Sequence, residues 1–188
     1  MSILKQPKLL IYGGAQFLTV LAWYVCQAFL PQFMMTERGI PHADAGNVIA
    51  FHGVGFTVGG IISGSIINRF KERAIFLSQF YTFVLCGISV TLIYAHEYWQ
   101  FSLLMLSYGG FVFGILTLRP LVLIDLCGQE SIKDGNCVIL FCNGVATLFG
   151  LPLVGFLKTK TGTLIYSFMF AAIGNMLAAL CYIVIKCT

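Results

Sequence analysis

Apolar residues fill six long stretches of the chain, and most polar positions are gathered in short segments between them. The stretches cover residues 9–34, 46–67, 74–94, 101–126, 137–157 and 164–185. Each could cross a hydrocarbon core of about 30 Å as a helix rising about 1.5 Å per residue. They lack the strict period of two that marks barrel strands, and only helices pair every backbone group within one segment in lipid. The pattern predicts an all-α membrane protein, with one bundle of six transmembrane helices over residues 1–188.

The composition excludes a soluble domain of this size. Hydrophobic residues make up 59% of the chain, charged residues only 10%, and the mean hydropathy is +0.91. A soluble protein would need far more charged residues to cover its surface. The connections between the apolar stretches are also short, so we expect no separate soluble domain.

The basic residues predict an orientation for this bundle. With both termini in the cytoplasm, seven basic residues would be cytoplasmic and three external, as loops that retain Lys and Arg should be. The seven are Lys5, Lys8, Arg69, Lys71, Arg73, Lys133 and Lys186, and the three are Arg38, Lys158 and Lys160. Orientation thus accounts for the net charge of +4, and we expect no nucleic-acid partner.

The chain carries none of the short motifs that organise enzyme sites. We find no phosphate-binding loop, no His and Glu pair at metal-ligand spacing and no nucleophile elbow. We therefore expect no catalytic residue, no metal and no cofactor, and the candidate function depends on polar groups placed within the apolar stretches.

The first stretch carries a polar stripe at offsets of four, three, four and four residues. It consists of Tyr12, Gln16, Thr19, Trp23 and Gln27. Such spacing places the side chains on one helical face, and lipid offers them no hydrogen bonds. We favour a polar cavity opposite the stripe over hydrogen bonding between helices. Asn143 in the fifth stretch is a further cavity candidate.

Arg119 is a full charge well inside a stretch, where its planar guanidinium could pair with a carboxylate. The sequence leaves two interpretations equally open: contact with an anionic solute, or snorkelling toward the nearby cytoplasmic end. His52 in the second stretch is more often a hydrogen-bonded packing residue than a proton carrier.

Small residues in the second stretch predict a close contact with a neighbouring helix. Gly53, Thr57, Gly60, Gly64 and Asn68 share one face, which Gly55 and Gly59 widen, and Gly110 with Gly114 gives the fourth stretch a similar face. Static packing and sliding during a transport cycle are equally compatible with this spacing.

Several blocks of sequence resemble one known family. They are residues 4–8, the run 58–60 followed by Gly64, Asn68 and Arg69, and the run 122–126 with Asp125, followed by Gly128, Glu130, Asn143, Gly144, Gly150, Pro152, Gly155, Thr161 and Gly162. These blocks resemble the carboxyl-terminal half of the monocarboxylate transporters, members of the major facilitator superfamily. The resemblance implies that the first and fourth helices line a central cavity, and hence that Arg119 contacts solute.

The chain also departs from that family. Where proton-linked members carry an acid and an arginine on the corresponding second helix, this chain has Phe56 and Gly60. Asn68 stands where the cytoplasmic motif has an aspartate. The family has twelve spans, and the resemblance covers the second six.

We therefore expect alternating-access transport of a small organic anion such as a monocarboxylate, by a symporter-like carrier of the plasma membrane of which this chain is the carboxyl-terminal half, a fragment or an isoform. The expected solute-binding residues are Arg119, Tyr12, Gln16, Trp23, Gln27 and Asn143, and the expected cytoplasmic conformational motif comprises Gly60, Gly64, Asn68, Arg69 and Asp125. The expected partners are the lipid bilayer, the solute and a second six-helix half or a homodimer partner. The alternative is a six-span protein that does not transport and instead binds or regulates a partner.

Overall fold

The computed structural model describes residues 7–69 and 73–187, without the side chains of residues 67–69 and 187. The described residues form six long helices and one short 3₁₀ turn: α1 Pro7–Arg38, α2 His42–Arg69, α3 Ala74–Tyr94, α4 Tyr98–Cys127, η3 Gln129–Ser131, α5 Ile132–Thr161 and α6 Ile165–Cys187. Each α-helix contains one of the apolar stretches to within a residue at its ends, and all six are long and apolar enough to cross a membrane. The predicted all-α class is confirmed.

Local sequence signals set the helix ends. The amide of Ile40 donates to the carbonyl of Met34 (3.0 Å) across Gly39, which has a φ of 66°, so α1 ends in a glycine-dependent cap. At the start of α4 the Gln100 side chain accepts a hydrogen bond from the backbone amide of Glu97 (3.2 Å), and the Glu97 side chain caps the backbone at Gln100 in return. This capping box begins α4 immediately after the three-residue connection, residues 95–97, that joins it to α3.

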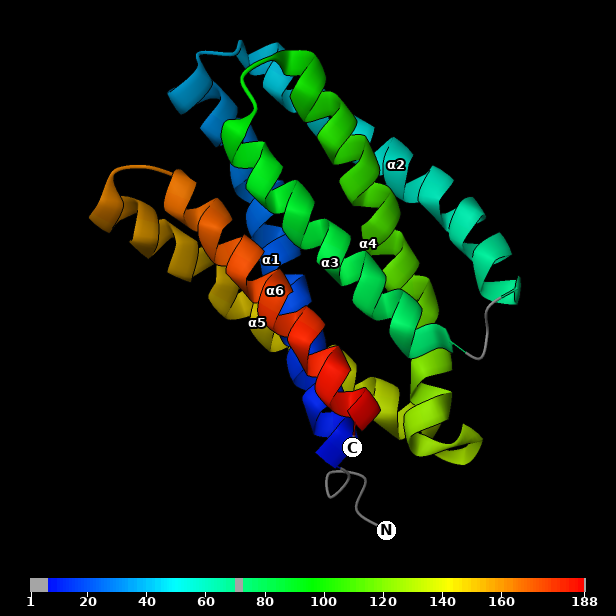
Figure 1. The fold of residues 1–188 in the computed structure, drawn as a ribbon. Coiled ribbons are helices and arrows are strands. Elements are labelled where there is room, and N and C mark those ends of the chain that lie inside the picture. Colours follow the sequence, from blue (N-terminus) through cyan, green and yellow to red (C-terminus); the bar gives the residue numbers. More distant parts are fainter. Residues whose placement is uncertain (1–6, 70–72, 188) are drawn as a thin grey trace.

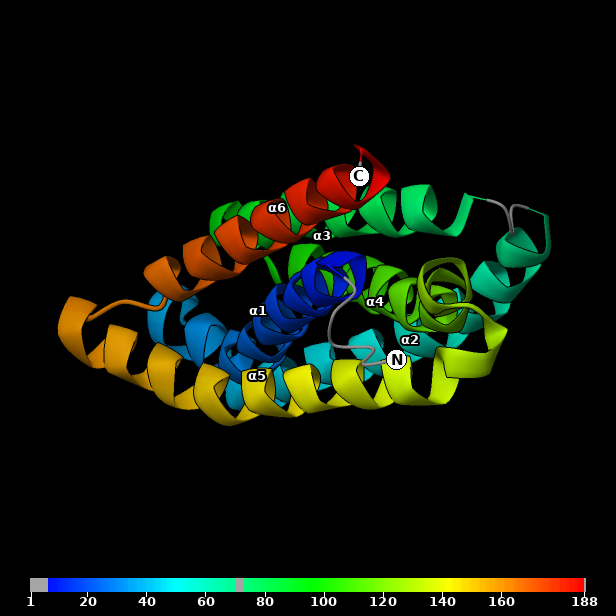
Figure 2. The ribbon, with the colours of Figure 1, turned by 90° about the horizontal axis from the view of Figure 1, so that it is seen from below.

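The six helices form three layers (Figure 1, Figure 2). Viewed along the bundle in Figure 2, α3 and α6 lie on one side, α2 and α5 on the other, and α1 and α4 between them. The packing agrees with this view, since α2 contacts chiefly α4, α5 contacts chiefly α1, and α6 contacts both α1 and α3. The described chain begins and ends at the same end of the bundle (Figure 1).

The closest helix contact joins α2 and α4 through glycines. A Cβ atom on Gly55 would overlap the backbone of Leu106, and one on Gly59 would overlap the backbone of Gly110. Gly53 and Gly64, by contrast, have open space where a Cβ atom would stand. The predicted close approach is present, but the expected face was wrong in part. The contact between the two backbones is made by Gly55 and Gly59, which we expected only to widen the face of Gly53 and Gly64.

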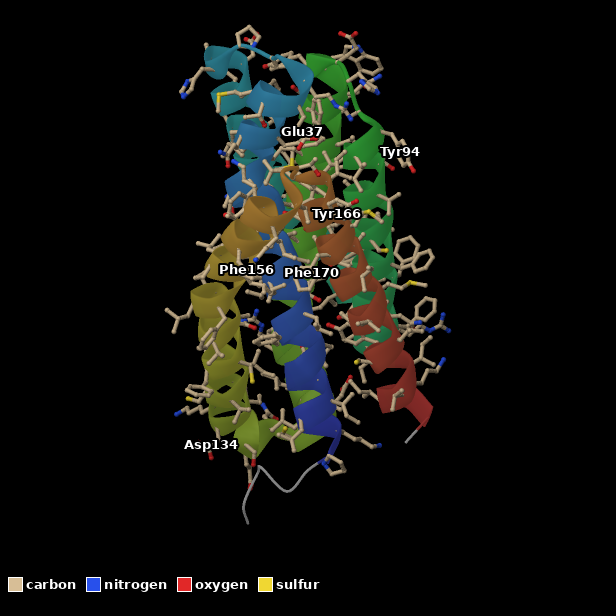
Figure 3. All side chains as sticks on the ribbon, turned by 90° about the vertical axis from the view of Figure 1, so that its left-hand side faces the viewer. Glu37, Tyr94, Asp134, Phe156, Tyr166 and Phe170 are labelled. Atoms are coloured by element: carbon tan, nitrogen blue, oxygen red, sulfur yellow. The ribbon has the colours of Figure 1, made fainter. Side chains whose placement is uncertain are left out.

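The far end of α1 is tied to both neighbouring hairpins. Arg38 Nη2 donates to the carbonyl of Ile93 at the end of α3 (2.6 Å), and Glu37 Oε1 accepts from the amide of Leu164 before α6 (2.6 Å). Figure 3 labels Glu37 close to the turn between α5 and α6, at the opposite end of the bundle from Asp134. These bonds fix the last turn of α1, the helix that carries the polar stripe.

Candidate functional site

A hollow of about 320 Å³ lies between α1, α4 and α5. Its lining residues are Val20, Trp23 and Tyr24 of α1, Leu116 and Arg119 of α4, and Leu140, Asn143, Gly144 and Thr147 of α5. The size falls at the lower end of the roughly 300–1,000 Å³ typical of small-molecule sites. Apolar walls with a few polar groups are also typical of such sites. The structure therefore brings together three of the predicted solute-binding residues: Arg119, Trp23 and Asn143.

Arg119 supplies the positive charge of this hollow. Its Nη2 atom lies 3.5 Å from Gln16 Oε1, at the outer limit of a hydrogen bond, and its Nε atom has no partner among the described residues. The described residues that line the hollow include no carboxylate. A guanidinium at membrane depth is normally paired or faces water. Here the charge is uncompensated by the walls around it, so an anion entering the hollow would be attracted to it.

The direction of the Arg119 side chain bears on the choice between solute contact and snorkelling. Its partner Gln16 lies about 14 Å along α1 from Pro7, at about 1.5 Å per residue. That depth is close to half of a hydrocarbon core of about 30 Å. The guanidinium therefore meets a polar side chain of α1 within the bundle. Pro120 follows Arg119 inside α4 and cannot donate to the carbonyl of Leu116, which leaves an additional polar group near the hollow.

Gln16 is held in place by the core behind the hollow. Its Nε2 atom donates to Tyr12 Oη (3.2 Å) and to Tyr182 Oη of α6 (3.1 Å), and its side chain is 1% exposed. Tyr12 is fully buried. At Gln16 the polar stripe therefore makes a hydrogen bond between helices, which is the alternative to the polar cavity that we expected for it. Tyr12 and Gln16 position Arg119 from behind the hollow.

Trp23 forms the aromatic wall. Its indole Nε1 donates to His52 Nε2 (3.3 Å), and its ring packs against Tyr24 (4.9 Å between centroids) and Phe56 (6.3 Å). Because His52 Nε2 accepts this bond, that nitrogen carries no proton in this arrangement. His52 is 4% exposed and serves as a hydrogen-bonded packing residue that orients Trp23.

Asn143 faces the hollow from α5 with spare hydrogen-bonding capacity. Its Oδ1 atom has no hydrogen-bond partner among the described residues, while its backbone carbonyl accepts from Thr147 Oγ1 (2.9 Å). An unpaired amide oxygen in a buried position is costly unless a ligand or water satisfies it.

The remaining predicted residues lie elsewhere. Gln27 is half-buried on α1 and lines none of the described cavities that include Trp23. A Cβ atom on Gly60 would meet the ring of Phe113, and Asp125 is exposed beside a second cavity near the end of α4. Gly64 has open space around it, and the side chains of Asn68 and Arg69 lie outside the described part of the structure.

Sequence reasoning missed some residues of this region. Tyr182, which bonds Gln16, is an aromatic residue within an apolar run of α6, and no spacing rule connects it with α1. Tyr24 and Leu140 line the hollow but resemble ordinary apolar span residues in sequence. Their role emerges only from the way in which α1, α4 and α5 pack.

Comparison with known proteins gives a family match over nearly the whole chain. The model of the Major Facilitator Superfamily matches residues 13–186. Among curated proteins, human monocarboxylate transporter 7 (Homo sapiens) is 23% identical over 188 residues, which cover 98% of this chain and 36% of that protein. The chain thus spans little more than a third of the length of this relative.

Solved structures give the same fold. A crystal structure of the peptide transporter POT in complex with sulfate matches with a TM-score of 0.75 and 16% identity, over 98% of this chain and 38% of that one. A mutant of a peptide transporter POT, also with sulfate, matches with a TM-score of 0.74 and 16% identity, over 94% of this chain and 37% of that one. At this identity the likeness establishes the fold alone. The matched part is a six-helix unit within a longer transporter chain.

Proposed function

Because the chain belongs to the major facilitator superfamily, an integral membrane transporter family, we propose that it acts as the carboxyl-terminal six-helix half of a monocarboxylate-transporter-like carrier. The proposed activity is transport of a small organic anion such as a monocarboxylate. The family and fold support transport of a small solute, and the likeness to monocarboxylate transporter 7 suggests the class of solute.

One observation carries the proposal: a hollow that contains Arg119 without a carboxylate in its walls. The guanidinium offers a planar fork of donors that fits a carboxylate with two parallel hydrogen bonds. Asn143 Oδ1 and the Trp23 ring provide a polar contact and an apolar wall for the rest of the solute. Gln16, held by Tyr12 and Tyr182, fixes the depth of the guanidinium.

Transport would follow the alternating-access scheme of two six-helix bundles that rock about a site near the membrane midplane. In this scheme α1, α4 and α5 supply one wall, and a second bundle, either another half or a second copy of this chain, supplies the other. The conformational change would alter contacts at the inner end of the bundle, where we place the motif residues Gly60, Gly64, Asn68, Arg69 and Asp125.

The position of Phe56 argues against a carboxylate-based proton relay on α2. Phe56 packs on Phe113 of α4 (4.6 Å between centroids) and on Trp23 (6.3 Å), so this site is occupied by an aromatic cluster. We infer that any ion coupling does not use residue 56 of α2.

The proposed orientation places both termini in the cytoplasm, with the plasma membrane as the location. Four described basic residues, Lys8, Arg73, Lys133 and Lys186, lie at the end of the bundle where the chain begins and ends, and Arg38, Lys158 and Lys160 lie toward the other end. This bias supports the cytoplasmic assignment of the termini.

Substitution of Arg119 tests the proposal. The chain is reconstituted into vesicles, and uptake of a radiolabelled short-chain monocarboxylate is measured for the wild type, Arg119→Ala and Arg119→Lys. We expect Arg119→Ala to abolish uptake and Arg119→Lys to retain part of it, because the ammonium keeps the charge and loses the fork. Lys133→Gln, which removes a charge outside the hollow, is the matched control. Equal uptake by the wild type and Arg119→Ala would refute the role of Arg119.

A second candidate function is that of a subunit that binds a partner without transporting. The exposed face of α2, which includes Gly53, Val54, Thr57 and Val58, favours it, because small and apolar side chains allow another helix to approach closely. This candidate predicts no saturable uptake of any monocarboxylate by the chain in vesicles, together with a stable helical partner recovered after mild detergent extraction from its native membrane.

A further inference from the structure

A second cavity, of about 520 Å³, lies at the end of the bundle where the chain begins and ends. It is lined by Arg73, Ile75 and Phe76 at the start of α3, Asp125 near the end of α4 and Lys186 near the end of α6. It shares no lining residue with the hollow around Arg119. The proposed function uses Asp125 as a motif residue, but it assigns no ligand to this cavity.

The charges around this cavity are unusual because they do not neutralise one another. Among the described residues, neither Arg73 nor Asp125 makes a hydrogen bond or an ion pair. The Lys186 Nζ atom lies 6.0 Å from the centre of the Phe76 ring. The cavity thus presents two cations and one carboxylate, all on exposed residues, to whatever occupies it.

The surroundings of the cavity are those of a membrane interface. Phe76, Phe80 and Phe83 follow one another along α3 and are 53%, 50% and 59% exposed. Their spacing of four and three residues places them on one helical face, where they would contact acyl chains. Charged residues at the end of such a helix meet the lipid headgroups.

We propose that this cavity binds the headgroup of phosphatidylserine. The phosphodiester and the carboxylate of that headgroup match Arg73 and Lys186, and its ammonium matches Asp125. Phosphatidylglycerol has no cation for Asp125, while phosphatidylethanolamine and phosphatidylcholine have one anion for two basic residues. Phosphatidylserine pairs every charge that the described residues give the cavity, and its acyl chains would extend along the phenylalanines of α3.

The test measures lipid retention by the full chain. The protein is reconstituted in phosphatidylcholine nanodiscs doped with equal mole fractions of phosphatidylserine, phosphatidylglycerol or phosphatidylethanolamine, released into mild detergent, and analysed by native mass spectrometry. We expect phosphatidylserine to be retained in preference to the other three. Arg73→Gln and Lys186→Gln should each reduce its retention roughly fivefold, the effect expected for one basic residue at a lipid surface. Asp125→Asn should weaken the preference over phosphatidylglycerol, because the carboxylate of phosphatidylserine still pairs the second basic residue.

Matched variants separate a specific site from general surface charge. Lys160 lies over the ring of Phe156 (5.8 Å) at the opposite end of the bundle, as Lys186 lies over Phe76, so Lys160→Gln should leave retention unchanged. Arg73→Lys keeps the positive charge and should retain most of the binding. This variant separates the loss of the charge in Arg73→Gln from misfolding. Equal retention of all four lipids, or equal losses in Lys160→Gln and Lys186→Gln, would overturn the proposal. So would displacement of the lipid by soluble glycerophosphoserine at a concentration equal to that of the lipid, since the acyl chains would then contribute nothing.

Discussion

At the scale of single residues, the candidate site depends on polar side chains that the solute would not touch. Gln16 joins three helices by bonding Tyr12, Tyr182 and Arg119. The sequence predicted that Gln16 faces away from lipid, because a glutamine in an apolar span needs a polar partner. It could not predict that Tyr182 is that partner, since the bond joins residues at opposite ends of the chain and many aromatic residues were available.

Gln16→Leu tests this positioning role. Leucine keeps the volume but leaves the hydroxyl groups of Tyr12 and Tyr182 without their shared partner, so we expect the free energy of unfolding to fall by about 1–3 kcal/mol. Arg119 would also lose its Gln16 contact. The measurement is thermal unfolding in detergent, together with affinity for a monocarboxylate. Gln27→Leu is the control, because the Gln27 side chain makes no hydrogen bond to a described residue and should tolerate the change. Equal effects of the two substitutions would argue against a network centred on Gln16.

At the scale of helices, glycine spacing predicted the existence of a close contact better than its location. Two sets of small residues on α2 have helical spacing. The set with Gly55 and Gly59 meets the backbone of α4, whereas in the other set Gly60 meets only the side chain of Phe113, and Gly53 and Gly64 meet open space. The partner helix determines which face of α2 is used. Gly109 and Gly110 have no side chains where α2 crosses α4, so the two backbones approach closely, and a Cβ atom on Gly109 would overlap the backbone of His52. Composition on one helix cannot reveal which of its faces another helix will use.

Gly59→Ala and Gly53→Ala test this contact with the same chemical change. A methyl group at residue 59 would overlap the backbone of Gly110, whereas at residue 53 it would meet open space. We expect Gly59→Ala to destabilise the bundle by about 1–3 kcal/mol, the usual cost of overpacking, and Gly53→Ala to be neutral or slightly stabilising. Thermal unfolding in detergent measures both. If Gly53→Ala proved the more damaging substitution, the contact between α2 and α4 would have to involve the other face.

At the scale of the whole molecule, hydropathy predicted six helices but not their arrangement in three layers. The order of α3 and α6, α1 and α4, and α2 and α5 across the bundle (Figure 2) depends on which faces pack. In α2, α3 and α4 the apolar residues are spread almost evenly around the helix, so the sequence does not single out one packing face. The resemblance to monocarboxylate transporters supplied the missing step by implying that the first and fourth helices line a cavity. In the structure Trp23 of α1 and Arg119 of α4 do share a hollow, which α5 completes.

The three layers predict which exposed side chains contact water and which contact lipid, a distinction that the exposed fraction of a side chain does not make. Leu140 on α5 lines the hollow and is 52% exposed, while Met176 on α6, in the opposite layer, is 42% exposed. In a membrane we expect the hollow to be wet and the layer of α3 and α6 to face lipid. In a background without the seven native cysteines, Leu140→Cys should therefore react with a charged thiol reagent, and Met176→Cys should not. Saturating monocarboxylate should protect Leu140→Cys if the solute occupies the hollow beside Arg119. Similar labelling of both cysteines in intact membranes would contradict the layering, and failure of Leu140→Cys to react in any condition would exclude an aqueous passage along α5.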